Sequence, residues 1–129
     1  MQLNVDTRTY GDLGVIVAAG EVDMATAGGI RQAITDLIGG GFKHLMLDMS
    51  EVSFIDSTGL GVIIGARKKV RHIDGTFSLV CNNPRTLRLF KITGIDQALP
   101  VHATRESAIA ALDLAAPLPA DGARLPQPR

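Results

Sequence analysis

The sequence has little cysteine, few aromatic residues and no net charge, and these shortages exclude several classes of protein. Its 129 residues include one cysteine, Cys81, which rules out a disulfide framework and any metal site built from several cysteines. Lysine plus arginine (13) equals aspartate plus glutamate (13), so the chain lacks the basic excess of a general nucleic-acid-binding protein. Hydrophobic residues still make up 46% of the chain, which is enough for one folded core.

Long hydrophobic runs are also missing. No stretch approaches the roughly 20 apolar residues of a membrane span, and residues 1–6 show neither the basic nor the apolar part of a signal peptide. Together with the single thiol, this predicts a cytoplasmic protein that binds no membrane. Cys81 ends the apolar run 77–81, so we expect it to be a buried core residue rather than a catalytic nucleophile.

The composition changes near Ala115. Four of the six prolines follow this point, namely Pro117, Pro119, Pro126 and Pro128, and no hydrophobic period accompanies them. We therefore expect residues 115–129 to form a disordered, proline-rich tail and residues 2–114 to form the folded domain.

Hydrophobic patterning within residues 2–114 predicts alternating strands and helices. The expected strands lie near residues 3–7, 15–19, 44–48, 77–81 and 101–102. The expected helices lie near residues 30–38, 57–72, 85–92 and 105–112, and residues 49–56 are expected to form a loop. This order, strand-strand-helix-strand-helix-strand-helix-strand-helix, predicts an α/β fold with a mixed, largely parallel five-stranded sheet flanked by four helices. Its second helix would face the sheet with Leu60, Ile63, Ile64 and Val70, and its last helix with Ala108, Ile109, Ala111 and Leu112.

The most unusual segment opens that second helix. Asp56, Ser57 and Thr58 stand in a row before Gly59 and Gly61, although a helix cap needs only one side-chain oxygen. One interpretation is a plain cap, with the glycines allowing close packing on the sheet. The other interpretation is that the hydroxyls are exposed for modification, because a helix N-terminus also tolerates an added phosphate.

Residues 45–61, which end in Asp56-Ser57-Thr58-Gly59-Leu60-Gly61, resemble the signature of anti-sigma factor antagonists, the small bacterial STAS-domain proteins. Residues 20–23 (Gly-Glu-Val-Asp) are similar to the family's approach to its first helix, and residues 79–82 and 89–95 to its later segment. The resemblance extends over residues 2–114 and implies the STAS fold.

The resemblance also implies a phosphorylation switch that works by partner exchange. The matching phosphorylation site is Ser57, with Thr58 as the alternative. The implied partners are an anti-sigma factor with ATP-dependent serine kinase activity, which the unphosphorylated form binds so that a sigma factor is freed, and a PP2C-type phosphatase. The protein itself would be no enzyme, would need no cofactor or metal, and would be a monomer when free. The expected partner-binding residues are Glu21, Asp23, Asp56, Ser57, Thr58, Gly59 and Leu60.

Other interpretations remain open. A phosphoacceptor receiver domain would use Asp48 at a strand end, and a serine hydrolase would pair Ser57 with His44, His72 or His102. A nucleotide-binding STAS signalling module without a sigma-factor partner would use the region from Gly59 to Gly61. Asp23 and Asp56 also suit simple capping roles. The basic run 67–72 is either a solvated helix end or a contact for an acidic partner.

Overall fold

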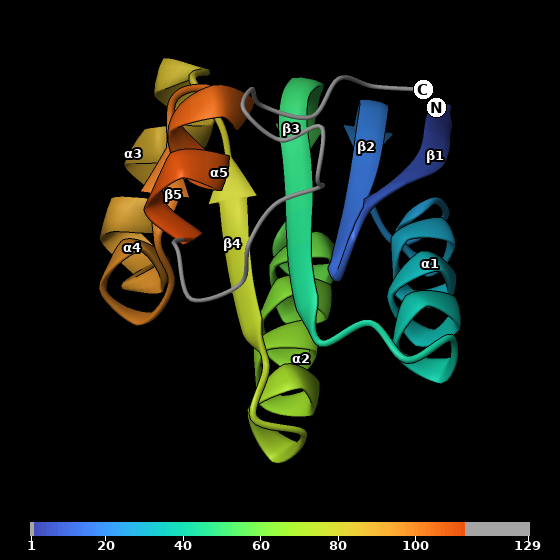
Figure 1. Cartoon of the computed structure of the whole chain (residues 1–129). Coiled ribbons are helices and arrows are strands. Elements are labelled where there is room, and N and C mark those ends of the chain that lie inside the picture. Colours follow the sequence, from blue (N-terminus) through green and yellow to red (C-terminus); the bar gives the residue numbers. More distant parts are fainter. Residues whose placement is uncertain (1, 113–129) are drawn as a thin grey trace.

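A sheet of five strands in the order β1-β2-β3-β4-β5 organises residues 2–112, the part of the chain that the computed structural model describes (Figure 1). The strands are β1 (Leu3–Tyr10), β2 (Leu13–Val22), β3 (His44–Ile55), β4 (Thr76–Val80) and β5 (Val101–His102). The helices are α1 (Ala27–Gly39), α2 (Ser57–His72), α3 (Pro84–Thr93), α4 (Ile95–Ala98) and α5 (Arg105–Leu112). β1 pairs antiparallel with β2, and all other pairs are parallel. The predicted mixed, largely parallel sheet is confirmed, whereas the expected tail 115–129 lies outside the described residues.

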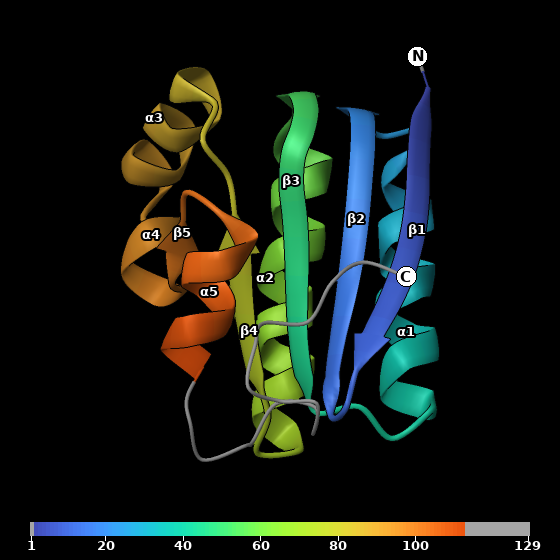
Figure 2. The same ribbon diagram turned by 45° about the horizontal axis from the view of Figure 1, so that its top comes forward.

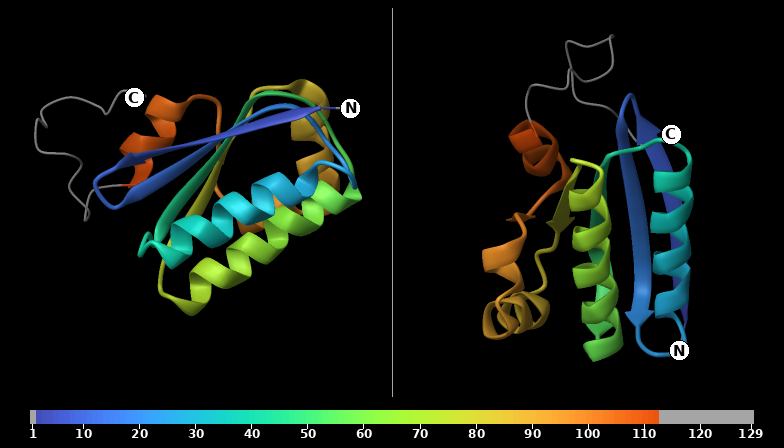
Figure 3. Two further views of the ribbon diagram at one scale, coloured as in Figure 1. Left: turned by 90° about the vertical axis from the view of Figure 1, so that its right-hand side faces the viewer. Right: turned by 90° about the horizontal axis from the view of Figure 1, so that it is seen from below.

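The helices are divided unequally between the two faces of the sheet. α1, α2, α3 and α4 pack on one side of the sheet and α5 packs on the other (Figure 3). The larger core fills the space under the first group and includes Ile16, Leu47 and Phe90, none of which is exposed. The smaller core lies on the α5 face and includes Met46 and Ile109. Figure 2 shows α5 over the β4 and β5 side of the sheet. None of the helices within residues 2–112 is long and apolar enough to span a membrane.

The predicted loop over residues 49–56 is wrong, because β3 continues to Ile55. Its second half pairs in parallel with the end of β2, after register shifts between Val17 and Ala19 and between Gly20 and Glu21. These irregularities interrupt the two-residue alternation by which a strand is recognised. Residues 49–55 therefore lack the regular alternation that predicts a strand, although Val52 is buried, as expected for a strand with one face against the core.

Three smaller expectations also need correction. The structure has five helices within residues 2–112 rather than four, because the single turn of α4 follows the left-handed Gly94. Ile64 does not hold α2 on the sheet, since 45% of it is exposed. Ala111 of α5, expected on that helix's apolar face, is likewise exposed. One-turn helices and single solvent-facing apolar residues leave no periodic signal in a sequence.

Cys81 follows β4 and is 1% exposed. Burial raises the pKa of its thiol, against smaller opposing effects of hydrogen bonds with Asn83 and Thr86. We therefore expect a chromogenic disulfide reagent to label the native protein at pH 8 far more slowly than the urea-unfolded protein. The thiol of the unfolded protein has the lower pKa and therefore ionises first as the pH rises. The free energy of unfolding is thus unaffected by this group below about pH 8.5 and falls as the pH rises above that value. Equally fast labelling of native and unfolded protein would contradict this.

Candidate functional site

The ends of β2 and β3 and the starts of α1 and α2 meet at one edge of the sheet. Val22 and Ile55 are register partners, and the Asp56 amide donates to the Val22 carbonyl over 3.1 Å. Paired residues of neighbouring strands lie about 5 Å apart. The expected site residues Glu21 and Asp23 are thereby brought beside Asp56 and the residues that follow it, from 30 or more positions away in the sequence.

Asp56 is the N-cap of α2. Its Oδ1 accepts hydrogen bonds from the amides of Thr58 (2.9 Å) and Gly59 (3.1 Å), while its own backbone is extended. The capping interpretation of Asp56 is therefore confirmed. This single carboxylate satisfies the start of the helix, so the neighbouring hydroxyls are not needed for capping. Ser57, the first residue of α2, is exposed, and Thr58 is half-buried.

Asp23 shapes the turn that leads into α1. Its Oδ1 accepts from the amides of Ala25 (2.9 Å) and Thr26 (3.0 Å), and its own amide donates to the Thr26 hydroxyl (2.9 Å). The Thr26 hydroxyl in turn lies 2.7 Å from the Glu21 carbonyl. Asp23 therefore has the structural role that the sequence left open, and it also adds a partly exposed negative charge beside Asp56.

Gly59 and Leu60, both expected to touch a partner, are buried beneath the exposed start of α2. Leu60 is 9% exposed and belongs to the larger core. A Cβ on Gly59 would lie 2.6 Å from Ile55 Cγ1 and 2.7 Å from Val22 Cγ1, closer than van der Waals contact permits. Close packing thus explains Gly59 but not Gly61, around which a Cβ would meet nothing within 4 Å.

The two glycines make a matched pair of substitutions. Gly59→Ala should destabilise the fold by about 1–3 kcal/mol, because the new methyl group overlaps the Cγ1 atoms of Ile55 and Val22. These atoms lie so close to the backbone that the side chains cannot move aside easily. Gly61→Ala should instead stabilise it by up to about 1 kcal/mol through helix propensity alone. Urea unfolding of both variants measures these changes. Equal effects of the two substitutions would show that the start of α2 is not packed as tightly as described.

The exposure of two hydrophobic residues at this edge was not predicted from the sequence. Met24, in the turn after β2, is 81% exposed, and Phe54, next to the end of β3, is 43% exposed. A hollow of about 280 Å³ beside Phe54 is also lined by Arg85 and Leu89 of α3. A sequence does not show whether an apolar residue in a turn or near the end of a strand is exposed, so only the tertiary structure could reveal them.

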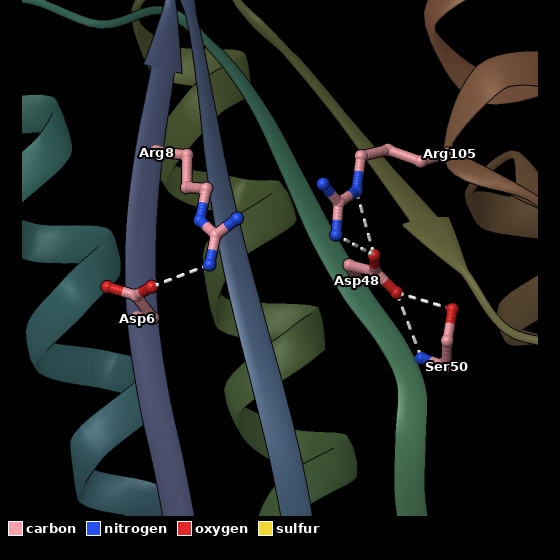
Figure 4. Close-up of polar contacts among 5 residues, drawn as sticks. All are labelled: Asp6, Arg8, Asp48, Ser50 and Arg105. Carbon is pink, nitrogen blue, oxygen red and sulfur yellow. Dashed lines mark hydrogen bonds and ion pairs between the residues drawn. The ribbon is translucent and has the colours of Figure 1, made fainter. Parts of the chain in front are cut away.

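Asp48, the acceptor that a receiver domain would need, is engaged in a polar cluster on the α5 face (Figure 4). Its Oδ2 accepts from Arg105 Nε (2.9 Å) and Nη2 (2.8 Å), and its Oδ1 from the Ser50 amide (2.9 Å) and hydroxyl (2.6 Å). Only 6% of the Asp48 side chain is exposed. Both oxygens are therefore bonded within the fold, although a cavity of about 490 Å³ opens beside the cluster.

The histidines that a hydrolase would need are far from Ser57. His72 ends the 16-residue helix that Ser57 begins, a separation of about 22 Å at 1.5 Å per residue. His44 begins the strand that ends just before Asp56, and it contacts the Thr76 hydroxyl (2.9 Å). His102 lies on β5 and pairs with Val80, and two strands, β3 and β4, separate β5 from β2. The structure therefore brings no histidine to the exposed serine.

The fold and the site define a class of protein: an α/β domain that presents a serine hydroxyl at the start of a helix, among acidic side chains. The chain belongs to the STAS domain family, whose family model matches residues 4–108. This confirms the family and the STAS-type fold expected from residues 45–61.

Individual relatives agree with this assignment. The chain is 33% identical to the anti-sigma-B factor antagonist of Bacillus subtilis over 109 residues, 84% of this chain and 99% of that protein. A crystal structure of an anti-sigma factor antagonist from Mycobacterium paratuberculosis is similar with a TM-score of 0.79 at 29% identity, over 85% of this chain and 93% of that one. The phosphorylated form of the Bacillus cell fate determinant SpoIIAA is similar with a TM-score of 0.66 at 25% identity, over 87% and 100% of the two chains.

Proposed function

We propose that this protein is an anti-sigma factor antagonist whose binding is switched by phosphorylation of Ser57. The observation that carries the proposal is the exposed hydroxyl of Ser57 at the first position of α2, left free of any capping duty by Asp56. The relatives support it, because those named above are anti-sigma factor antagonists, and one of them, SpoIIAA, has been solved in an unphosphorylated and in a phosphorylated form.

The start of α2 suits a serine that is modified without loss of the fold. The positive end of the helix dipole favours an anion there by about 0.3–1 kcal/mol. The side chain points away from the core, since Ser57 is exposed while Gly59 and Leu60 lie beneath it. Thr58 is the less accessible alternative, because it is half-buried. Ser57 therefore offers the better acceptor for a kinase.

The unphosphorylated edge forms the surface that binds the anti-sigma factor. Its exposed and partly exposed members are Glu21, Asp23, Asp56, Ser57 and Thr58, with Gly59 and Leu60 supporting them from below. The anti-sigma factor acts as the serine kinase and transfers the γ-phosphoryl group of ATP to the Ser57 hydroxyl, releasing ADP. A PP2C-type phosphatase hydrolyses the phosphoserine and restores binding. The antagonist itself acts by binding rather than catalysis, in the cytoplasm where its partners and ATP are found.

Ser57→Ala and Thr58→Ala separate the two acceptors. Phosphorylation by the host's anti-sigma factor kinase with ATP should raise the intact mass of the wild type and of Thr58→Ala by one phosphate, and leave Ser57→Ala unchanged. Ser57→Ala should bind the kinase constitutively and change stability by less than about 0.5 kcal/mol, because Ser57 is exposed and Asp56 caps the helix. Stoichiometric phosphorylation of Ser57→Ala, with the phosphate located on Thr58 by fragmentation, would assign the switch to Thr58 instead.

A further inference from the structure

The charges of this electrically neutral chain are distributed very unevenly. Helices α2 and α3 together carry seven lysines and arginines and no acidic residue. These cations are Arg67, Lys68, Lys69, Arg71, Arg85, Arg88 and Lys91. All are exposed except Arg67, which is half-buried. The two ion pairs found within residues 2–112 are Arg8–Asp6 and Arg105–Asp48, so none of these seven cations forms an ion pair with a carboxylate of the described chain.

The two helices form one surface rather than two separate ones. They lie on the same side of the sheet, and so does α4, which follows α3 in the chain (Figure 3). Arg67 of α2 donates through Nε to the carbonyl of Ala98, the last residue of α4, over 3.0 Å. Because α4 packs against α3, it links the basic run 67–72 to the helix that carries the other three cations. We call the exposed side of α2 and α3 the basic surface.

Exposed hydrophobic side chains are interspersed among these charges. Ile64 on α2 is 45% exposed, and Leu87 and Ile92 on α3 are 38% and 74% exposed. In a docked complex these side chains would add apolar area to the interface. On α2, Ser57, Ile64 and Lys68 follow the spacing of one helix stripe, so the basic surface continues from the edge that bears Ser57.

We propose that the basic surface docks an acidic surface of the same anti-sigma partner that covers Ser57, a proposal that rests on the proposed function. The charge of the surface is complementary to an acidic partner, and long-range attraction of this kind chiefly accelerates association. The apolar faces of α2 and α3 are already buried against the sheet through residues such as Ile63 and Phe90, so neither helix has an apolar face left to enter a bilayer. Nor does the basic surface expose an aromatic ring on which a nucleic-acid base could stack, since Phe90 is fully buried.

The location of these charges also separates two parts of the interface. Lys68 lies eleven residues from Ser57 along α2, about 16 Å, which exceeds the Debye length at physiological salt. A phosphate on Ser57 therefore leaves the attraction by the cations at the far end of α2 largely intact. The basic surface therefore determines the association rate of the partner, and the phosphorylation state of Ser57 determines its dissociation rate.

Single charge reversals test this inference against a matched control. Lys68→Glu and Lys91→Glu lie on the basic surface, whereas Lys43→Glu makes the same change of net charge at an exposed position before β3. Surface plasmon resonance with the immobilised anti-sigma kinase of the host gives association rates between about 50 and about 400 mM NaCl. We expect each of the first two variants to associate about three- to tenfold more slowly at low salt, with a weaker salt dependence. Lys43→Glu should behave like the wild type, and Ile92→Ala should dissociate faster.

The outcomes distinguish this inference from the proposed function. One outcome would overturn the inference about the basic surface alone. In it, the wild type binds and Ser57→Glu does not, but the association rates are equal for Lys68→Glu, Lys91→Glu and Lys43→Glu. Absence of wild-type binding would overturn both proposals. Cosedimentation with vesicles of about one part phosphatidylglycerol to three parts phosphatidylcholine examines the membrane alternative. Vesicle binding that Lys91→Glu abolishes, with its partner kinetics unchanged, would assign the surface to lipid instead.

Discussion

Phosphorylation of Ser57 should lower the affinity for the anti-sigma partner by roughly 30-fold to a few thousand-fold while leaving the fold unchanged. The phosphate adds about −1.5 to −2 charges. It does so beside Asp56, whose carboxylate caps the same helix, and next to Asp23, which β2 places alongside. Burying such a charge without a paired cation costs about 2–5 kcal/mol in a complex, and that cost falls on binding.

The helix itself should withstand the modification. Leu60, Ile63 and Val70 anchor α2 in the larger core, and each contributes about 1.5–3 kcal/mol of burial. Their sum exceeds any local repulsion between the phosphate and Asp56, and the helix dipole offsets part of that repulsion. The change should therefore be confined to the surface near Ser57.

Titration calorimetry with the partner and amide chemical shifts of both forms measure the two halves of this prediction. Ser57→Glu carries one charge instead of nearly two and should weaken binding less than phosphate does. Thr35→Glu, at an exposed position on α1, adds the same charge away from the site and should leave the affinity unchanged. Shift changes throughout residues 60–70 with an unaltered affinity would contradict the prediction.

Asp48→Ala should destabilise the protein by about 2–3 kcal/mol. Removing one partner of a buried ion pair costs about 3–5 kcal/mol, because the remaining charge is left without compensation. Here 20% of the Arg105 side chain is exposed, so water relieves part of that cost. The same substitution removes the acceptor of the Ser50 amide and hydroxyl. α5 should loosen first, because its described contacts with the sheet depend on few buried side chains, chiefly Ala108 and Ile109.

Urea unfolding of Asp48→Ala, Arg105→Ala and the double variant gives the coupling energy between the two residues. Asp6→Ala is the control, since Asp6 pairs with Arg8 at 3.0 Å but 64% of its side chain is exposed (Figure 4). We expect a loss below about 1 kcal/mol for this surface pair. Equal losses for Asp48→Ala and Asp6→Ala would show that the Asp48–Arg105 pair does not hold α5.

Features that depend on near neighbours in the chain were predictable from the sequence. The hairpin closes at Gly11, whose φ is +60°, and α1 ends before Gly41, whose φ is +95°. Asn83 caps α3 immediately before Pro84, as its sequence indicates. The candidate site was predictable for the same reason, since Asp56 and Ser57 begin a helix within one turn of each other. Caps, turns and helical periods involve residues at most four positions apart.

Only the tertiary structure decided which distant segments meet. The second half of β3 exists because the end of β2 pairs with it across a register shift, and that pairing also brings Asp23 beside Asp56. Asp48 meets Arg105 from 57 positions away, and the basic run of α2 is joined to α4 through the contact of Arg67 with Ala98. A sequence states the charge and polarity of each residue but not its distant neighbours, because those are selected by the packing of the whole sheet and its helices.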